Sequence, residues 1–179
     1  IACTAMLLSV CQAIQASHGG TDTNRANLLL QDLMNEISAC HWADPISPSH
    51  WGPEADELIT KTRVAFDDID DYDGWNGPPQ TRDGITYDLL QKTLFPSVTT
   101  STYAQYTQSV HVEYVNSAGD VMPAGTTSSY RRVTIQISQE GRPPHKLNQI
   151  FQDAATLLGR TNWFDPRVVE PIAEVLYVP

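Results

Sequence analysis

The first sixteen residues constrain the fold most, because they form an apolar stretch without a single charge. Residues 1–16 read IACTAMLLSVCQAIQA. The stretch is shorter than the roughly 20 residues that cross a bilayer, yet it resembles the second half of a membrane helix. We therefore expect an apolar helix whose contact residues are Ile1, Met6, Leu7, Leu8, Val10 and Ile14. The alternatives are a buried core helix and a cleavable signal peptide, which usually carries a basic region that this stretch lacks.

A second helix is expected after a break. Gly19 and Gly20 predict the break, since each glycine costs about 1 kcal/mol relative to alanine inside a helix. Thr21 and Asp22 are good N-cap residues for a helix that begins there. From Thr23 to about Ala39, apolar residues recur at helical spacing: Ala26, Leu29, Leu30, Leu33, Met34 and Ile37. This pattern predicts an amphipathic helix with one face against a core.

The rest of the chain reads as loops followed by strands. Proline and glycine punctuate residues 43–109, which predicts a long irregular region. Hydrophobic alternation then predicts antiparallel strands over residues 110–115 and 130–139. The next segment fits either a third strand over residues 145–152 or a helix over residues 147–158.

These patterns predict an α+β fold. A long N-terminal helix, broken near Gly19-Gly20, packs on a small antiparallel sheet with a long irregular loop region. We divide the chain into a helical part over residues 1–42 and a globular head over residues 43–179.

The charge is strongly negative, and part of it is concentrated in one loop. Lys and Arg number 11 against 21 Asp and Glu, a formal charge of -10. This balance disfavours nucleic acid as a partner but suits a divalent cation. The loop carries Asp67, Asp68, Asp70, Asp71 and Asp73. Because Ca²⁺ binds six to eight oxygens, these five residues are candidate calcium ligands.

The calcium prediction has a structural alternative. The loop lacks the EF-hand pattern, because Ile69 stands where the first Asp belongs and Gln80 where the Glu would fall. The aspartates could instead cap turns, accept backbone N–H bonds and pair with Arg63, Arg82 or Arg131. Phe66, Ile69, Tyr72 and Trp75 recur every three residues, so we also expect the loop to be anchored by an apolar edge.

One segment carries a family resemblance. Residues 66–75 read FDDIDDYDGW, between the apolar segment and the predicted strand YRRVTIQIS. In this order, from about residue 1 to about residue 151, the chain resembles the type IV pilin and pseudopilin superfamily. It is most similar to minor pilins related to the mannose-sensitive haemagglutinin pilus. The family's processing site, a Gly before Phe or Met with a Glu at the fifth position, is absent, so we expect Ile1 to lie inside the mature protein.

The resemblance implies a structural role. The chain would be a subunit of a type IV pilus-like or pseudopilus extracellular filament, anchored in the inner membrane before assembly. Its partners would be copies of itself or other pilins, joined through the apolar helix.

Another kind of protein remains an alternative, a membrane-tethered extracellular binding or adhesin head that does not polymerise. Trp42, Trp51, Trp75 and Trp163 motivate it, because sugar faces stack on such rings. No enzyme activity is expected, since the sequence has no G-x-S-x-G motif, P-loop or H-x-x-x-H pair.

Overall fold

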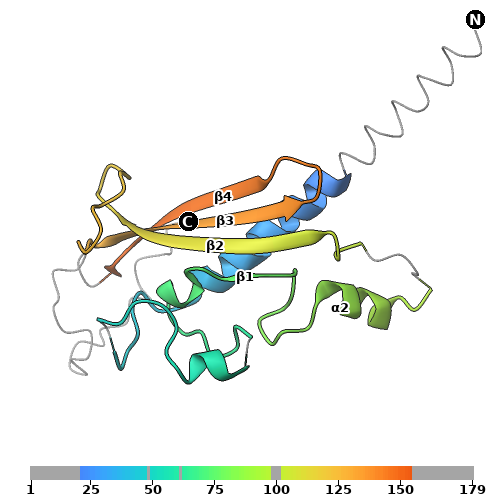
Figure 1. Cartoon of the computed structure of the whole chain (residues 1–179), viewed down its shortest axis with the longest axis horizontal. Coiled ribbons are helices and arrows are strands. Elements are labelled where there is room, and N and C mark those ends of the chain that lie inside the picture. Colours follow the sequence, from blue (N-terminus) through green and yellow to red (C-terminus); the bar gives the residue numbers. More distant parts are fainter. Residues whose placement is uncertain (1–20, 48, 61, 98–101, 155–179) are drawn as a thin grey trace, which may run out of the picture.

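The computed structural model describes residues 21–47, 49–60, 62–97 and 102–154. In these ranges a four-stranded antiparallel sheet, in the order β1-β2-β3-β4, is covered on one face by a helix over residues 21–38 (Figure 1). The strands are Asn76–Gly77 (β1), Tyr106–Val115 (β2), Tyr130–Gln139 (β3) and His145–Gln152 (β4). A second α-helix, α2, spans Tyr87–Leu94, and 3-10 turns span Glu57–Thr60 and Asp70–Tyr72.

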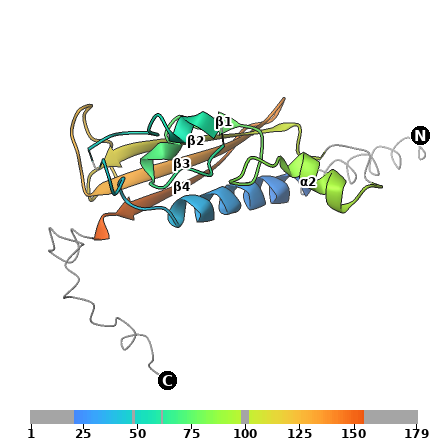
Figure 2. The same cartoon turned by 90° about the horizontal axis from the view of Figure 1, so that it is seen from below.

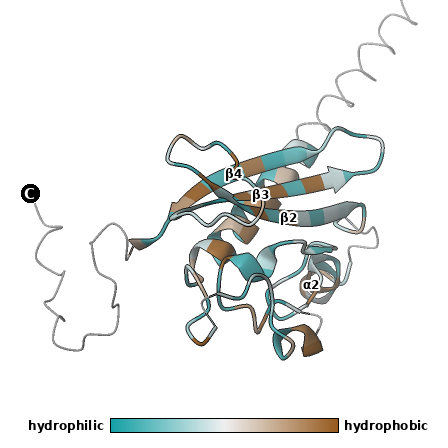
Figure 3. Cartoon of the chain, turned by 60° about the vertical axis from the view of Figure 1, so that its left-hand side comes forward, coloured by the Kyte–Doolittle hydropathy of each residue, from teal (hydrophilic) through white to brown (hydrophobic). Residues whose placement is uncertain are grey.

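The core lies between the first helix and the sheet (Figure 2). Alternate residues of β2 and β3 point toward the helix, with Val110 opposite Ile135 and Val112 opposite Val133. The alternation is visible as changing colour along the strands (Figure 3). The helix contributes its buried face: Ala26, Leu29, Leu30, Leu33, Met34 and Ile37. Each large aliphatic side chain buried here contributes about 1.5–3 kcal/mol, so this contact holds the helix on the sheet.

Several predicted elements are confirmed. The amphipathic helix covers residues 21–38, and β3 has the predicted bounds. β2 is also present but begins earlier than expected, at Tyr106. The ambiguous segment is a strand over its first part, because Leu147 pairs with Ile135 and Phe151 with Arg131, so the helical reading of residues 147–152 is wrong.

The prediction of a long N-terminal helix packed on the sheet is wrong. Both α-helices within the described ranges are short, and the one that packs on the sheet ends at residue 38. At 1.5 Å per residue it is about 27 Å long, which already covers most of the roughly 33 Å of a ten-residue strand. The expected break at Gly19-Gly20 and the contact residues Ile1, Met6, Leu7, Leu8, Val10 and Ile14 lie outside the described residues.

The loop region is less irregular than predicted, because it contains α2. Thr86 caps this helix by accepting a hydrogen bond from the backbone N–H of Leu89 at 3.3 Å. Lys92 and Asp88 form a pair four residues apart, at 3.0 Å. Across the described ranges, no helix has the length and apolar character that crossing a membrane requires.

Candidate functional site

The acidic loop, residues 66–75, is held by an apolar edge as the three-residue spacing predicts. Phe66, Ile69 and Tyr72 are buried, and Trp75 packs partly buried against the same core. The rings of Phe66 and Tyr72 meet edge-on with centroids 5.1 Å apart. The backbone of this loop is therefore fixed before any ligand is considered.

The loop is also tied to the C-terminal end of the first helix. The His41 N–H donates to the Asp67 carbonyl at 2.8 Å, and the Ile69 N–H donates to the His41 carbonyl at 3.0 Å. Beside these bonds, Arg63 donates to both carboxylate oxygens of Glu36, at 2.8 and 2.9 Å. We call this set of contacts the helix clamp.

Asp70 forms the buried ion pair of the loop. Its carboxylate meets the guanidinium of Arg131, and both side chains are almost fully buried. The guanidinium also lies against three rings, 4.6 Å from Trp42, 5.1 Å from Trp51 and 5.4 Å from Tyr114. This geometry places cation–π contacts around a charge that has left water.

The alternative prediction was that the aspartates pair with Arg63, Arg82 or Arg131. This pairing is confirmed for Arg131 alone among the three. Arg131 pairs with Asp70, whereas Arg63 pairs with Glu36. Arg82 donates to the backbone carbonyls of Arg63 and Phe66.

Asp73 connects the loop to β2. Its Oδ1 accepts the Val112 N–H at 2.9 Å and lies 2.9 Å from Nδ1 of His111. Its Oδ2 accepts a hydrogen bond from the indole N–H of Trp51 at 3.2 Å. Asp70 and Asp73 therefore hold the fold together and do not join the other acidic residues.

The remaining three aspartates meet two glutamates. Asp67, Asp68 and Asp71 form one group whose ligand atoms lie within 4.8 Å of one another, and Asp71 forms a second such group with Glu54 and Glu57. We call these five residues the carboxylate cluster. Its members come from the acidic loop and from the segment that leads into the Glu57–Thr60 turn.

Hydrogen bonds fix part of the carboxylate cluster. Oδ1 of Asp68 accepts the backbone N–H of Asp70 at 2.8 Å. Oδ2 of Asp71 accepts the backbone N–H groups of Asp67 at 2.9 Å and Asp68 at 3.0 Å. Oε2 of Glu57 accepts the Glu54 N–H at 3.0 Å.

The electrostatics of the carboxylate cluster favour a proton or a cation. Burial raises the pKa of Asp68 to about 8, and the negative charge of Asp70 adds to this shift. Burial likewise raises the pKa of Glu57 to about 8 and shifts the pKa values of Asp67 and Asp71 upward. These acidic groups could hold a metal ion, whose charge would stabilise the ionised carboxylates.

The sequence prediction of five aspartate ligands corresponds only in part to this arrangement. Three of the five share the carboxylate cluster, and two do not. Glu54 and Glu57 were missed, although two acidic residues three apart directly after Pro53 were a signal that a turn would present both. Both carboxylate oxygens of Glu54 lack a hydrogen-bond partner among the described residues, while Oε1 lies 3.2 Å from Nδ1 of His50.

Comparisons of this chain with known proteins identified no relative. A scan against protein-family models and searches of curated proteins and of solved structures found no match to this chain.

Proposed function

We propose that this chain is a structural subunit of a type IV pilus-like or pseudopilus extracellular filament. The observation that carries the proposal is the order of the segments: the uncharged segment over residues 1–16 precedes a helix whose apolar face packs on a folded head. Apolar burial between subunits would stabilise assembly by about 25 cal/mol per Å². The partners are copies of this chain or other pilins, and the inner membrane holds the subunit before assembly.

The proposal gives a role to several exposed apolar side chains. Leu28 on the first helix is 68% exposed, and Leu94 and Phe95 at the end of α2 are 62% and 58% exposed. Leu89 of α2 is also exposed, and no residue of α2 is buried. Neighbouring subunits would cover such side chains in an assembled filament.

The filament proposal is tested on the native protein from a sheared cell-surface fraction. We expect the chain in that fraction, with a methylated Phe or Met at its native N-terminus and Glu at the fifth position. Leu7→Glu should remove the protein from the fraction, because it buries a charge between subunits. Gln12→Glu is the matched control, since it adds the same charge at a position that is already polar.

A different outcome would support the alternative function. A native N-terminus at or near Ile1, or a lipidated cysteine, combined with absence from the sheared fraction, would overturn the filament proposal. The chain would then be a tethered binding head.

We further propose that Ca²⁺ occupies the carboxylate cluster and stiffens the acidic loop. Buried carboxylates with raised pKa values gain most from a cation, and Ca²⁺ accepts irregular sets of oxygen ligands. Mg²⁺ should be less effective, because it demands octahedral geometry and gives up water reluctantly.

The calcium proposal predicts a change in thermal stability of the full chain. Calcium at 100 times its dissociation constant should add about 2.7 kcal/mol to the free energy of unfolding, seen as a higher melting midpoint than in chelator. Asp71→Asn should abolish the difference, while its amide oxygen can still accept the Asp67 and Asp68 N–H bonds. An unchanged midpoint of the wild-type chain, with and without chelator, would remove calcium from the proposal.

A further inference from the structure

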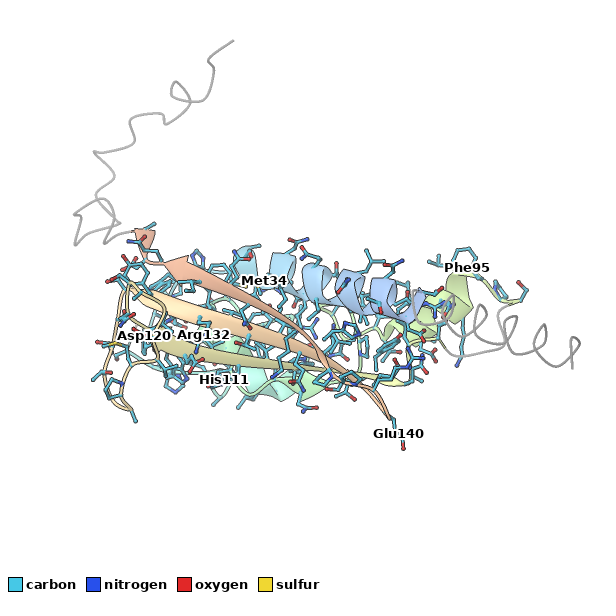
Figure 4. The ribbon with its side chains drawn as sticks, turned by 90° about the horizontal axis from the view of Figure 1, so that it is seen from above. Met34, Phe95, His111, Asp120, Arg132 and Glu140 are labelled. Carbon is cyan, nitrogen blue, oxygen red and sulfur yellow. The ribbon has the colours of Figure 1, made fainter. Side chains whose placement is uncertain are left out.

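A groove of about 470 Å³ opens beside the C-terminal end of β2. Residues 49–51, residues 112–114 of β2 and the loop over residues 121–127 line it. In Figure 4 this end of the molecule carries His111, Asp120 and Arg132, whereas Phe95 lies at the opposite end. The volume falls within the range of small-molecule sites, roughly 300–1,000 Å³.

One wall of the groove is a rigid pair of aromatic rings. Trp51 and Tyr114 have centroids 4.8 Å apart and are tilted by 48°. Trp51 is 36% exposed, so part of its ring remains open to a ligand. Contact with the Arg131 guanidinium and the indole bond to Asp73 hold the ring in place. A ring fixed in advance costs a ligand little conformational entropy.

The charges in the groove are already matched. The Asp73 carboxylate is engaged by Trp51, His111 and the Val112 N–H. Oε1 of Glu113 accepts from Nε of Arg132 at 3.0 Å and from its Nη2 at 2.6 Å. The guanidinium of Arg131 already uses the quadrupole of both rings. A cationic ligand would therefore find no free counter-charge among the carboxylates and rings described here. An anionic ligand would find Arg132 and His50 already beside Glu113 and Glu54.

The loop over residues 121–127 offers apolar and hydroxyl groups. Val121, Met122 and Pro123 provide apolar surface, and Thr126 and Thr127 provide hydroxyl groups. The Thr126 hydroxyl already donates to the Pro123 carbonyl, so toward a ligand it acts as an acceptor. A pyranose ring matches this combination, because one face carries C–H groups and its edge carries hydroxyls. Charged ligands do not match it.

We propose that the groove binds one pyranose unit of an uncharged glycan, with its C–H face on Trp51 and its hydroxyl edge toward Thr126 and Thr127. The inference goes beyond the filament proposal, because the groove is complete within a single chain. It applies equally to an assembled subunit and to an isolated head.

Ligand binding to the full 179-residue chain is measured by saturation-transfer NMR and by tryptophan fluorescence. The uncharged probes are cellobiose, maltose, lactose, mannobiose and chitobiose; free sialic acid and choline are the anionic and cationic probes. We expect saturable binding of at least one uncharged disaccharide and none of either charged probe. Trp51→Ala should weaken that binding at least about tenfold, which corresponds to 1.4 kcal/mol.

Because Trp51 contacts the buried Arg131, Trp51→Ala could lose binding by destabilising the fold, so the test includes a second variant. Ala124 is exposed on the groove wall, so Ala124→Trp should block the groove without touching the core. Phe95→Ala, an exposed aromatic at the opposite end, is the control and should bind as the wild type does. The proposal is overturned if no uncharged disaccharide binds, if only a charged probe binds, or if Ala124→Trp binds with unchanged affinity.

Discussion

Two adjacent arginines show that a shift of one position in a strand changes both the burial and the ion-pair partner of a side chain. Arg131 and Arg132 point to opposite faces of β3, as the alternation predicts. Arg131 is 2% exposed and pairs with Asp70, whereas the Arg132 side chain is 27% exposed and pairs with Glu113. Removing either guanidinium deletes the same chemical group. Only the removal of the Arg131 guanidinium leaves a fully buried carboxylate, that of Asp70, without its partner.

The two substitutions should therefore differ in cost. Arg131→Met should lower the free energy of unfolding by about 3–5 kcal/mol, because the Asp70 carboxylate stays buried without its partner. Arg132→Met should cost at most about 1 kcal/mol, since solvent screens that pair. Urea unfolding at neutral pH compares them directly. Equal losses for the two variants would contradict the role given to Arg131.

The same scale shows why the carboxylate cluster could be predicted only in part. The sequence places five aspartates in one loop, but it does not give the direction of each side chain. The turn at Asp70–Tyr72 sends Asp70 toward Arg131 and Asp71 back to the N–H groups of Asp67 and Asp68. Glu54 and Glu57 join from another segment: their spacing after Pro53 indicates a turn, but not that this turn lies against Asp71.

At the scale of elements, the local sequence pattern predicted a strand correctly where its hydrophobic alternation is uninterrupted. β3 alternates without interruption and was predicted to the residue. The start of β2 was missed because Gln108, a polar residue, is buried on the core face and masks the alternation. Leu147 and Phe151 stand four residues apart, a spacing that suits both a strand and a helix, so only the pairing with β3 resolves it. The cap at Thr86 could have revealed α2.

The carboxylate cluster should make the free energy of unfolding depend on pH in a defined direction. The pKa values of Asp68 and Glu57 are raised on folding, so the folded state binds more protons than the unfolded state between about pH 4 and pH 8. The free energy of unfolding should therefore fall as pH rises through this window in chelator, and level off above it.

Urea unfolding across this pH range checks the sign. Glu57→Gln should flatten the fall, because it removes one of the two groups with a strongly raised pKa. Asp83→Asn, at an exposed carboxylate outside the carboxylate cluster, is the matched control and should leave the slope unchanged. Stability that rises from pH 5 to pH 8 in chelator would contradict the assignment.

At the scale of the whole molecule, the formal charge of -10 sets a condition on the proposed assembly into a filament. Like-charged subunits repel within a screening length of about 8 Å at physiological salt, so any stable contact between them must offset that repulsion. Apolar surface is the available source, and the exposed side chains of Leu28, Leu94 and Phe95 provide some of it. The uncharged segment over residues 1–16 would provide more.

The helix clamp has a mechanical consequence. The first helix runs lengthwise along the strands (Figure 4), its buried face packed on the sheet and its C-terminal end fastened through His41 and Glu36. A pull arriving at residue 21 along the helix axis would load all these contacts in shear. Shear shares the load over the full contact, whereas peeling would break one turn at a time, so the head is built to bear tension applied through its first helix.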